Sequence, residues 1–324
     1  MKTSALMIGT TAVLALIVCQ AIGAAAPGPE ANPADLLDAC NVVWDSPSKD
    51  SGGSMPLGNG DIGLNAWVEE NGDLVFFISK TDSWTDSGRL VKLGQVRLRL
   101  TPSLAVQPFR QELQIRKGVI EIQSGTGDQQ SIIRLWVDAN RPVIHIEGES
   151  RQDIEAQVGL YVWRTADCDM QKESSIGYLR ELNTGPIMEK ADTLLPQKDN
   201  RIVWYHRNAG TIVPLAMKMQ NVESLLPLVH DPILHNTFGG AISGKGMVSA
   251  AAGEATQALK TAEPTRRLDV AIHLLGAQTD TAEEWVEKLN GIIAEEHTTG
   301  VNEAWLAHCA WWQEFWSRSW IYVR

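Results

Sequence analysis

Cysteine is scarce in this sequence of 324 residues. Only Cys19, Cys40, Cys168 and Cys309 are present, and no two of them have the Cys-x-x-Cys spacing. A disulfide scaffold or a cysteine-ligated zinc site needs several closely spaced cysteines, so neither is predicted. One disulfide in an oxidising compartment and buried thiols both stay open, and buried thiols are the favoured interpretation.

Clusters of positive charge are also absent. The chain has 28 Lys and Arg against 39 Asp and Glu, a net charge of −11 at pH 7 and no basic run. Nucleic-acid binding depends on Lys and Arg that neutralise phosphates, so we expect no nucleic-acid partner. An acidic surface is consistent with a soluble secreted protein that binds a neutral ligand such as a sugar.

Short catalytic signatures are missing too. The sequence contains no Gly-x-Ser-x-Gly, His-Glu-x-x-His or Gly-Lys-Ser/Thr motif, so we assign no catalytic residue and predict no cofactor. His230 and His235 enclose Asp231 and Pro232. Because the proline makes this segment a turn rather than one face of a helix, a loop without an ion is favoured over a metal site.

The first residues have the pattern of a sorting signal. Lys2 is followed by an almost wholly apolar run over residues 6–22, then by three alanines at 24–26 and by Pro27. A membrane anchor is the alternative, but the run is short for a span and no basic residues follow it. The sequence therefore predicts a cleaved signal peptide at residues 1–26. We expect a secreted or periplasmic protein with no membrane attachment after cleavage.

The pattern from residue 41 to about residue 275 is that of β-strands, and we assign a β-sandwich domain to residues 27–278. Residues 69–73 (EENGD) form a hairpin turn signal, and residues 95–100 alternate apolar and polar side chains. Many short strands separated by turns are typical of a sandwich or barrel. The predicted fold is mainly β: a large two-sheet antiparallel super-β-sandwich followed by two linker α-helices. Further strands are predicted at 64–68, 74–79, 113–115, 120–122, 131–137, 142–146, 156–162, 202–206, 212–219 and 268–275.

Residues 279–324 have a helical pattern instead. Thr281 and Glu284 form a capping box at the start of one helix, and a second helix is predicted from about residue 302 to residue 318. Five of the twelve tryptophans lie between Trp305 and Trp320. Such a stripe is an aggregation liability unless it is covered. We expect part of it to dock on the sandwich and the rest to pack against a following domain.

Two polar segments carry the candidate binding residues. Asn59 and Asp61 lie in a glycine-rich turn at residues 58–63, and Asp82 and Trp84 lie in the segment 81–86. Carboxylates, amides and an indole are the groups that hold sugars, by hydrogen bonds and by stacking. The alternatives are a purely structural glycine turn and a solvated turn beside a core tryptophan. A catalytic carboxylate pair formed by Asp82 and Asp86 is also open.

The same segments carry a family resemblance. Residues 56–63 (PLGNGDIG) resemble a segment near the start of family-95 glycoside hydrolases, the α-L-fucosidase group. Residues 79–84 (SKTDSW) resemble the segment that follows there, but depart from it at Ser79 and Lys80. The chain is more similar to the N-terminal domain of a group of secreted bacterial proteins, domain of unknown function 5703. That resemblance covers most of residues 40–320, and it rests on residues 44–48, 78–82, 204–208 and 231–240.

The resemblance implies a function as well as an architecture. In the fucosidase group an N-terminal super-sandwich and a helical linker precede an (α/α)6 barrel that holds the general acid and base. The chain ends at Arg324, before such a barrel, so none of those catalytic positions is assigned to it. We expect a non-catalytic β-sandwich domain of a secreted glycoside-hydrolase-like protein, with carbohydrate and its own C-terminal barrel as partners. The alternative is a stand-alone carbohydrate-binding or adhesion module.

Overall fold

The computed structural model describes residues 33–173 and 186–319. The predicted signal peptide at residues 1–26 lies outside these ranges. Within them, no helix combines the length and the apolar character that a membrane crossing requires.

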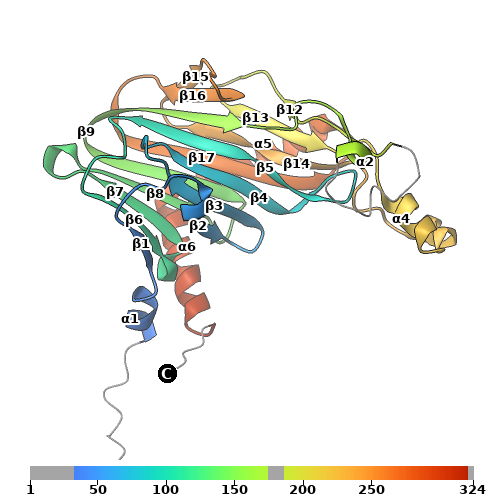
Figure 1. Cartoon of the computed structure of the whole chain (residues 1–324), viewed down its shortest axis with the longest axis horizontal. Coiled ribbons are helices and arrows are strands. Elements are labelled where there is room, and N and C mark those ends of the chain that lie inside the picture. The colour runs from blue at the N-terminus through green and yellow to red at the C-terminus, as the bar shows by residue number, and fades with distance from the viewer. Residues whose placement is uncertain (1–32, 174–185, 320–324) are drawn as a thin grey trace, which may run out of the picture.

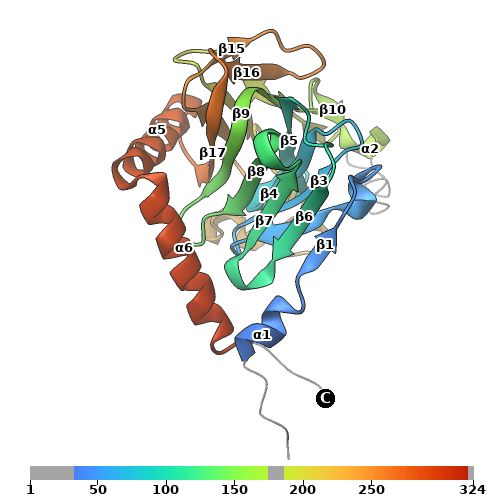
Figure 2. The same cartoon turned by 90° about the vertical axis from the view of Figure 1, so that its left-hand side faces the viewer.

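Antiparallel strands form most of the described chain (Figures 1 and 2). Fifteen of them form one large sheet that is nearly closed into a barrel, and β10 and β11 form a separate pair. The strands are β1 (Val42–Trp44), β2 (Met55–Gly58), β3 (Ile62–Val68), β4 (Leu74–Trp84), β5 (Leu90–Thr101), β6 (Phe109–Gln114), β7 (Val119–Ser124), β8 (Ser131–Val137), β9 (Val143–Tyr161), β10 (Cys168–Asp169), β11 (Met188–Glu189), β12 (Thr193–Leu194), β13 (Ile202–Arg207), β14 (Asn236–Gly244), β15 (Met247–Ala250), β16 (Gln257–Thr261) and β17 (Thr265–Gln278).

The long strand β9 joins the two halves of the fold. Its first part pairs with β8 and β17, and its second part pairs with β5 and β16. A register shift in β17 between Thr265 and Arg267 marks the place where the partners change. The predicted mainly β fold with two C-terminal helices is confirmed. The two predicted sheets, however, are two arms of one sheet, because this 19-residue strand belongs to both.

The core lies between the two arms. Fully buried side chains of both arms form one hydrophobic cluster, and Phe76, Leu98, Ile144, Ile146 and Leu160 are among its members. The alternation in residues 95–100 predicted which face of β5 is buried, and Val96, Leu98 and Leu100 do lie in the core. Burial of each such side chain contributes roughly 1.5–3 kcal/mol, so the sheet is the main source of stability.

Two helices cover the outer face of the sheet. Helix α5 (Ala282–Thr299) buries Trp285, Leu289 and Ile293 against β13, β14 and β17. Its predicted capping box is present: Thr281 Oγ1 accepts a hydrogen bond from the Glu284 amide at 3.1 Å. The Glu284 carboxylate accepts its return bond from the Asp280 amide at 3.0 Å.

Helix α6 (Val301–Trp316) lies beside the turn between β6 and β7 and then leaves the sheet (Figure 2). Trp305 packs on Trp136, with ring centroids 5.3 Å apart, and Trp316 Nε1 donates to the Ile115 carbonyl at 2.9 Å. Leu306 stays 69 % exposed. Docking of part of the tryptophan stripe on the sheet is therefore confirmed, and the stripe gives weaker support for a covering domain than the sequence implied.

One predicted strand is wrong. Residues 212–219 form helix α4 (Val213–Met219) instead, with Pro214 in its first turn, where proline is tolerated. The β-branched residues Ile212 and Val213 indicated a strand, but the segment has no strand partner. Helix α4 and the short helix η4 (Glu223–Leu228) form an arm that projects from the sheet (Figure 1).

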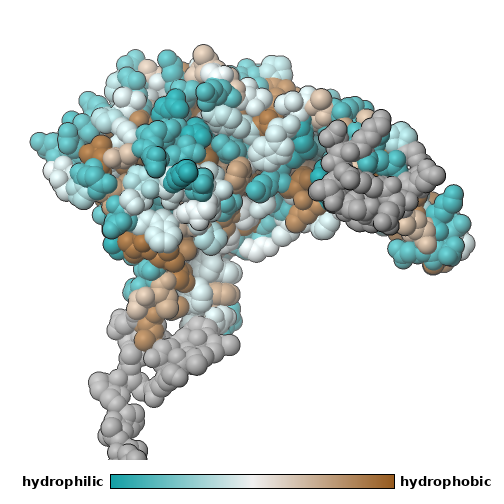
Figure 3. All heavy atoms as spheres, viewed as in Figure 1, coloured by the Kyte–Doolittle hydropathy of each residue, from teal (hydrophilic) through white to brown (hydrophobic). Residues whose placement is uncertain are grey.

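Smaller elements complete the described chain. They are α1 (Pro33–Asp38), α2 (Met170–Glu173), η1 (Ser51–Gly53), η2 (Ile115–Lys117) and η3 (Gly127–Gln129). β15 and β16 pair as an antiparallel hairpin. On the face in Figure 3 the sheet is mainly hydrophilic, and apolar atoms gather where α1 and α6 leave it.

Candidate functional site

Asn59 closes the glycine-rich turn between β2 and β3. Its Oδ1 accepts hydrogen bonds from the amides of Asp61 at 3.0 Å and Ile62 at 2.8 Å. Its Nδ2 donates to the Asp138 carbonyl at 2.8 Å, which ties this turn to the one between β8 and β9. Since both ends of the amide are engaged within the protein, the geometry favours a structural role for Asn59.

Asp61 and Asp82 meet at Lys80. The Lys80 ammonium lies 2.9 Å from a carboxylate oxygen of each, and Thr81 Oγ1 donates to Asp61 Oδ1 at 2.8 Å. The pairing of β3 with β4 places Ile62 opposite Lys80. Alternation along β4 then puts residues 80 and 82 on one face. The sequence predicted both carboxylates but missed the lysine that joins them.

Burial differs sharply within this group. The Lys80 side chain is 7 % exposed, whereas each carboxylate side chain is 42 % exposed. The buried ammonium therefore fixes two carboxylates whose side chains are partly open to solvent, although the second oxygen of Asp82, Oδ1, is itself buried. Asp82 also packs directly on Gly276 of β17, where an added Cβ would lie 2.2 Å from Asp82 Oδ2. Only glycine fits at that position without moving the carboxylate.

Trp84 ends β4 beside these residues. Its side chain is 43 % exposed, and its Nε1 donates to the Thr81 carbonyl at 3.0 Å. The indole is thus oriented by its own strand but is not part of the core, which excludes the core-tryptophan alternative. We call Asp61, Lys80, Thr81, Asp82 and Trp84 the sheet-end patch.

The sheet-end patch is suited to binding rather than to acid catalysis. A glycosidase needs two carboxyl groups on opposite sides of the bond that breaks, one of them carrying a proton. Here an ammonium lies between the two carboxylates as a counter-ion. The alternative pair of Asp82 and Asp86 also fails, because Asp86 is 3 % exposed and accepts from the Gly210 amide at 2.6 Å.

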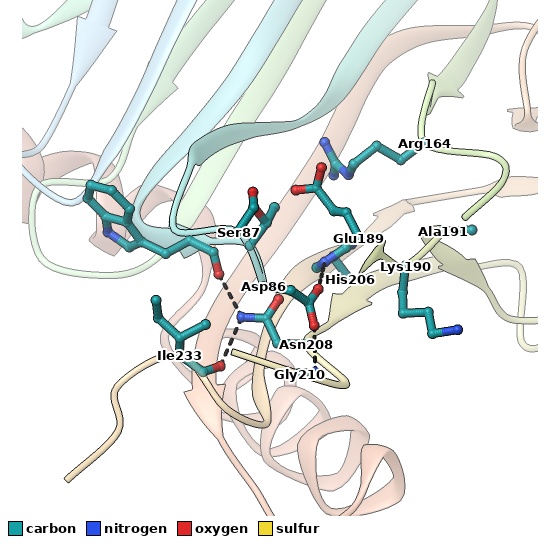
Figure 4. A network of polar contacts seen from close by, with 12 residues as sticks. Asp86, Ser87, Arg164, Glu189, Lys190, Ala191, His206, Asn208, Gly210 and Ile233 are labelled. Atoms are coloured by element: carbon teal, nitrogen blue, oxygen red, sulfur yellow. Dashed lines mark hydrogen bonds and ion pairs between the residues drawn. The ribbon is translucent and has the colours of Figure 1, made fainter. Parts of the chain in front are cut away.

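A buried polar network lies behind the patch (Figure 4). Asn208 Nδ2 donates to the carbonyls of Trp84 at 2.8 Å and Ile233 at 2.9 Å. His206, on the same face of the chain, lies between Asp86 and Asp192: Nε2 is 3.5 Å from Asp86 Oδ2, and Nδ1 is 3.1 Å from Asp192 Oδ1. His206 lies next to the last residue of β13, so both of these contacts form at the end of the strand.

The carboxylates set the protonation of His206. Burial lowers its pKa, but the hydrogen bonds and charges of Asp192 and Asp86 outweigh burial, so that the pKa is raised. Nothing in the sequence pairs Asp192 with His206, since the contact crosses from the segment before β12 to the end of β13. The run of polar residues at 206–208, which ends an otherwise apolar strand, was the one available signal.

Two further buried histidines lie where helix α6 contacts the sheet: His145 on β9 and His308 on α6. Burial lowers the pKa of His145 to about 3 and that of His308 to about 4. His308 Nδ1 accepts from the Ala139 amide at 3.2 Å, and Nε2 lies 2.8 Å from the Lys117 carbonyl, as the neutral tautomer allows. We call His145 and His308 the buried imidazole pair. Because both rings are buried in the neutral form, we expect the docking of α6 to weaken in acid.

A separate groove of about 610 Å³ lies on the outer face of β8, β9 and β17, near the start of α6. Glu147 and Asp269 line it side by side, because they are register partners on the paired strands β9 and β17. Burial raises the pKa of both carboxyl groups. None of the predicted candidate residues lines this groove, so it offers a natural comparison for the sheet-end patch.

The structure gives no support for an ion at the two loop histidines. His230 Nε2 lies 2.8 Å from Gln278 Oε1, and the His235 carbonyl accepts from Arg207 at 3.2 Å. Among residues 33–173 and 186–319, no three His, Cys, Asp or Glu side chains are arranged to hold a metal.

The fold and the patch together define a mainly β domain with a small polar and aromatic surface at one end of its sheet. The chain belongs to the family described as domain of unknown function (DUF5703), which matches residues 43–321. The resemblance to that family is confirmed, and the resemblance to family-95 glycoside hydrolases stays a prediction.

The chain was also compared with curated protein sequences and with solved structures. No curated protein sequence matches the chain. One solved structure that it resembles is a protein from the human microbiome described as a kojibiose phosphorylase. The TM-score is 0.45 at 10 % identity, over 85 % of this chain and 38 % of that protein. The chain thus spans well under half of that protein's length, and this likeness carries no conclusion about function.

Proposed function

We propose that this chain is a non-catalytic, carbohydrate-binding β domain of a secreted glycoside-hydrolase-like protein. One observation carries the proposal: two half-exposed carboxylates and an exposed indole converge at the sheet end, around a buried lysine. Three of the four residues that the sequence singled out, Asp61, Asp82 and Trp84, thus form one surface.

The chemistry of this surface matches that of a sugar. A pyranose presents hydroxyl groups at its rim and C–H groups on its faces. The fixed oxygens of Asp61 and Asp82 accept hydrogen bonds from hydroxyls, and charged acceptors form the stronger ones. The Trp84 ring offers a flat apolar surface to the C–H face. Oriented polar groups beside an aromatic ring are what small-ligand sites use to fix orientation.

Catalysis belongs, in this proposal, to a further domain. The two carboxylates of the sheet-end patch share one ammonium counter-ion, and the resemblance to family-95 enzymes places the general acid and base in an (α/α)6 barrel. Export rests on the signal-peptide pattern of residues 1–26.

A stand-alone binding or adhesion module is the second candidate function. The docking of Trp305 and Trp316 on the chain's own sheet favours it, because a self-sufficient module covers its own indoles. Both candidates require sugar binding, and they differ in glycosidase activity of the natural full-length protein. Hydrolysis or phosphorolysis by that protein supports the first, and binding without turnover supports the second.

The test of sugar binding is a glycan array probed with residues 27–324, followed by calorimetry on the glycan that binds. Trp84→Ala should weaken binding at least about tenfold, which corresponds to about 1.4 kcal/mol. Glu147→Gln, in the separate groove, is the matched control and should leave affinity unchanged. Loss of affinity in Glu147→Gln but not in Trp84→Ala would show that the sugar binds in the groove and not at the sheet-end patch. Absence of binding to every glycan would refute the proposal.

A further inference from the structure

The turn that carries Trp84 is held from behind by contacts to two distant segments (Figure 4). Asn208 joins the Trp84 carbonyl to the Ile233 carbonyl at the base of the arm. Asp86, two residues after Trp84, accepts from the Gly210 amide at 2.6 Å. The position of the indole therefore depends on the chain around residues 206–210, in which the side chains of His206 and Asn208 are buried.

His206 is the centre of these contacts. It is 1 % exposed, it stacks on Phe238 with ring centroids 5.0 Å apart, and its two ring nitrogens face Asp86 and Asp192. Arg164 Nε binds the same Asp192 oxygen at 2.8 Å. The imidazole thus connects the turn after β4, the end of β13 and the segment before β12.

The charges around His206 balance only when it is protonated. Asp86 and Asp192 carry two negative charges, and Arg164 supplies one positive charge. The neighbouring cations are already paired, Arg89 with Glu189 and Lys190 with Asp167. A neutral imidazole has one N–H, so one nitrogen lone pair would then face a buried carboxylate. Burying an uncompensated charge in this way is strongly unfavourable.

We propose that protonated His206 is a positioning residue for Trp84, and that its deprotonation loosens the sheet-end patch and weakens sugar binding. The regulation of sugar binding rests on the proposed function, whereas the positioning of the turn does not. Asp86 transmits the effect to the turn, and Asn208 transmits it to the Trp84 main chain.

The direction of the pH dependence follows from the raised pKa of His206. In the unfolded chain a histidine titrates near pH 6.5. The ion-paired imidazolium stabilises the network fully below that pH, and the contribution is lost as pH rises through the higher folded-state value. The turn should therefore be ordered at mildly acidic pH and loosen under alkaline conditions.

The structural test needs no ligand. An NMR titration of the His206 ring in the wild-type chain should give a midpoint above 6.5. Hydrogen exchange of residues 82–90, corrected for the intrinsic effect of pH, should lose protection with the same midpoint. Asp86→Asn keeps an oxygen for the Gly210 amide but removes one charge, and should lower the midpoint by about 1 pH unit. His297→Gln, at an exposed histidine of α5, is the matched control.

The outcomes separate the two proposals. Unchanged protection of residues 82–90 while His206 titrates would overturn the positioning role, and so would an unchanged midpoint in Asp86→Asn. The second arm repeats the array of neutral oligosaccharides at pH 6 and pH 9, where binding should be at least about fivefold weaker at pH 9. An array that shows no binding at either pH, together with pH-dependent protection, would refute sugar binding and leave the positioning role intact.

Discussion

Replacement of Lys80 by methionine tests the construction of the sheet-end patch. The variant keeps most of the apolar stem but removes the ammonium that lies 2.9 Å from both Asp61 and Asp82. Two carboxylates then face each other without a counter-ion. Breaking a fully buried ion pair costs about 3–5 kcal/mol.

The exposure of the partners sets the size of the effect. Because each carboxylate side chain is 42 % exposed, water recovers part of its solvation and screens the repulsion. We therefore expect Lys80→Met to lower the free energy of unfolding by about 2 kcal/mol. That corresponds to a fall in Tm of about 3–4 °C for a domain of this size.

The assay is urea unfolding followed by circular dichroism, with a triple variant as the matched control. Lys80→Met combined with Asp61→Asn and Asp82→Asn keeps the shapes but removes both charges, so it should recover most of the lost stability. A single variant as stable as wild type would show that the ammonium does not hold the carboxylates. A triple variant no better than the single one would show that lost packing, not repulsion, is the cause.

The remaining predictions concern two glycines and the C-terminal helices. Gly276→Ala places a methyl group on the Asp82 carboxylate, so it should weaken glycan binding at least about tenfold in calorimetry; unchanged affinity would show that Asp82 is not a ligand-binding group. Gly118→Ala adds a Cβ at φ +58°, 2.2 Å from Trp312 Nε1, and should cost about 1–3 kcal/mol and raise hydrogen exchange in α6; normal protection of α6 would contradict its docking there. The lowered pKa values of the buried imidazole pair mean that the unfolded chain binds more protons below about pH 6.5, so stability should fall with decreasing pH by up to about 1.4 kcal/mol per unit for each ring. Urea unfolding between pH 7 and pH 4 measures this slope. A free energy of unfolding that does not change over this range would show that the two imidazoles do not control stability in acid.

Local patterns made much of the fold predictable. The alternation in residues 95–100 identified the buried face of β5, and the capping box at Thr281 identified the start of α5. Both depend on neighbours in sequence. The joining of the two arms was not predictable in this way, because it depends on which strands pair with each part of β9. The 212–219 segment was mistaken because its β-branched residues outweighed Pro214.

The candidate site was predictable as a set of residue types but not as a geometry. Asp61, Asp82 and Trp84 were identified from polar and aromatic composition near a turn. Lys80 was missed because a lysine in a strand is normally solvated, and its burial follows only from the approach of β3. The role of Asn59 was also not predictable, since its partner, the Asp138 carbonyl, is distant in sequence.

The proposed contact between sugar and the sheet-end patch can be observed by an NMR titration. The indole N–H signals of the ¹⁵N-labelled chain are recorded during addition of the glycan selected on the array, with Trp84→Phe used to assign the Trp84 signal. If sugar binds at the patch, the Trp84 signal should shift in a saturable way, with the dissociation constant found by calorimetry. A saturable shift confined to other indoles, with the Trp84 signal unmoved, would contradict it.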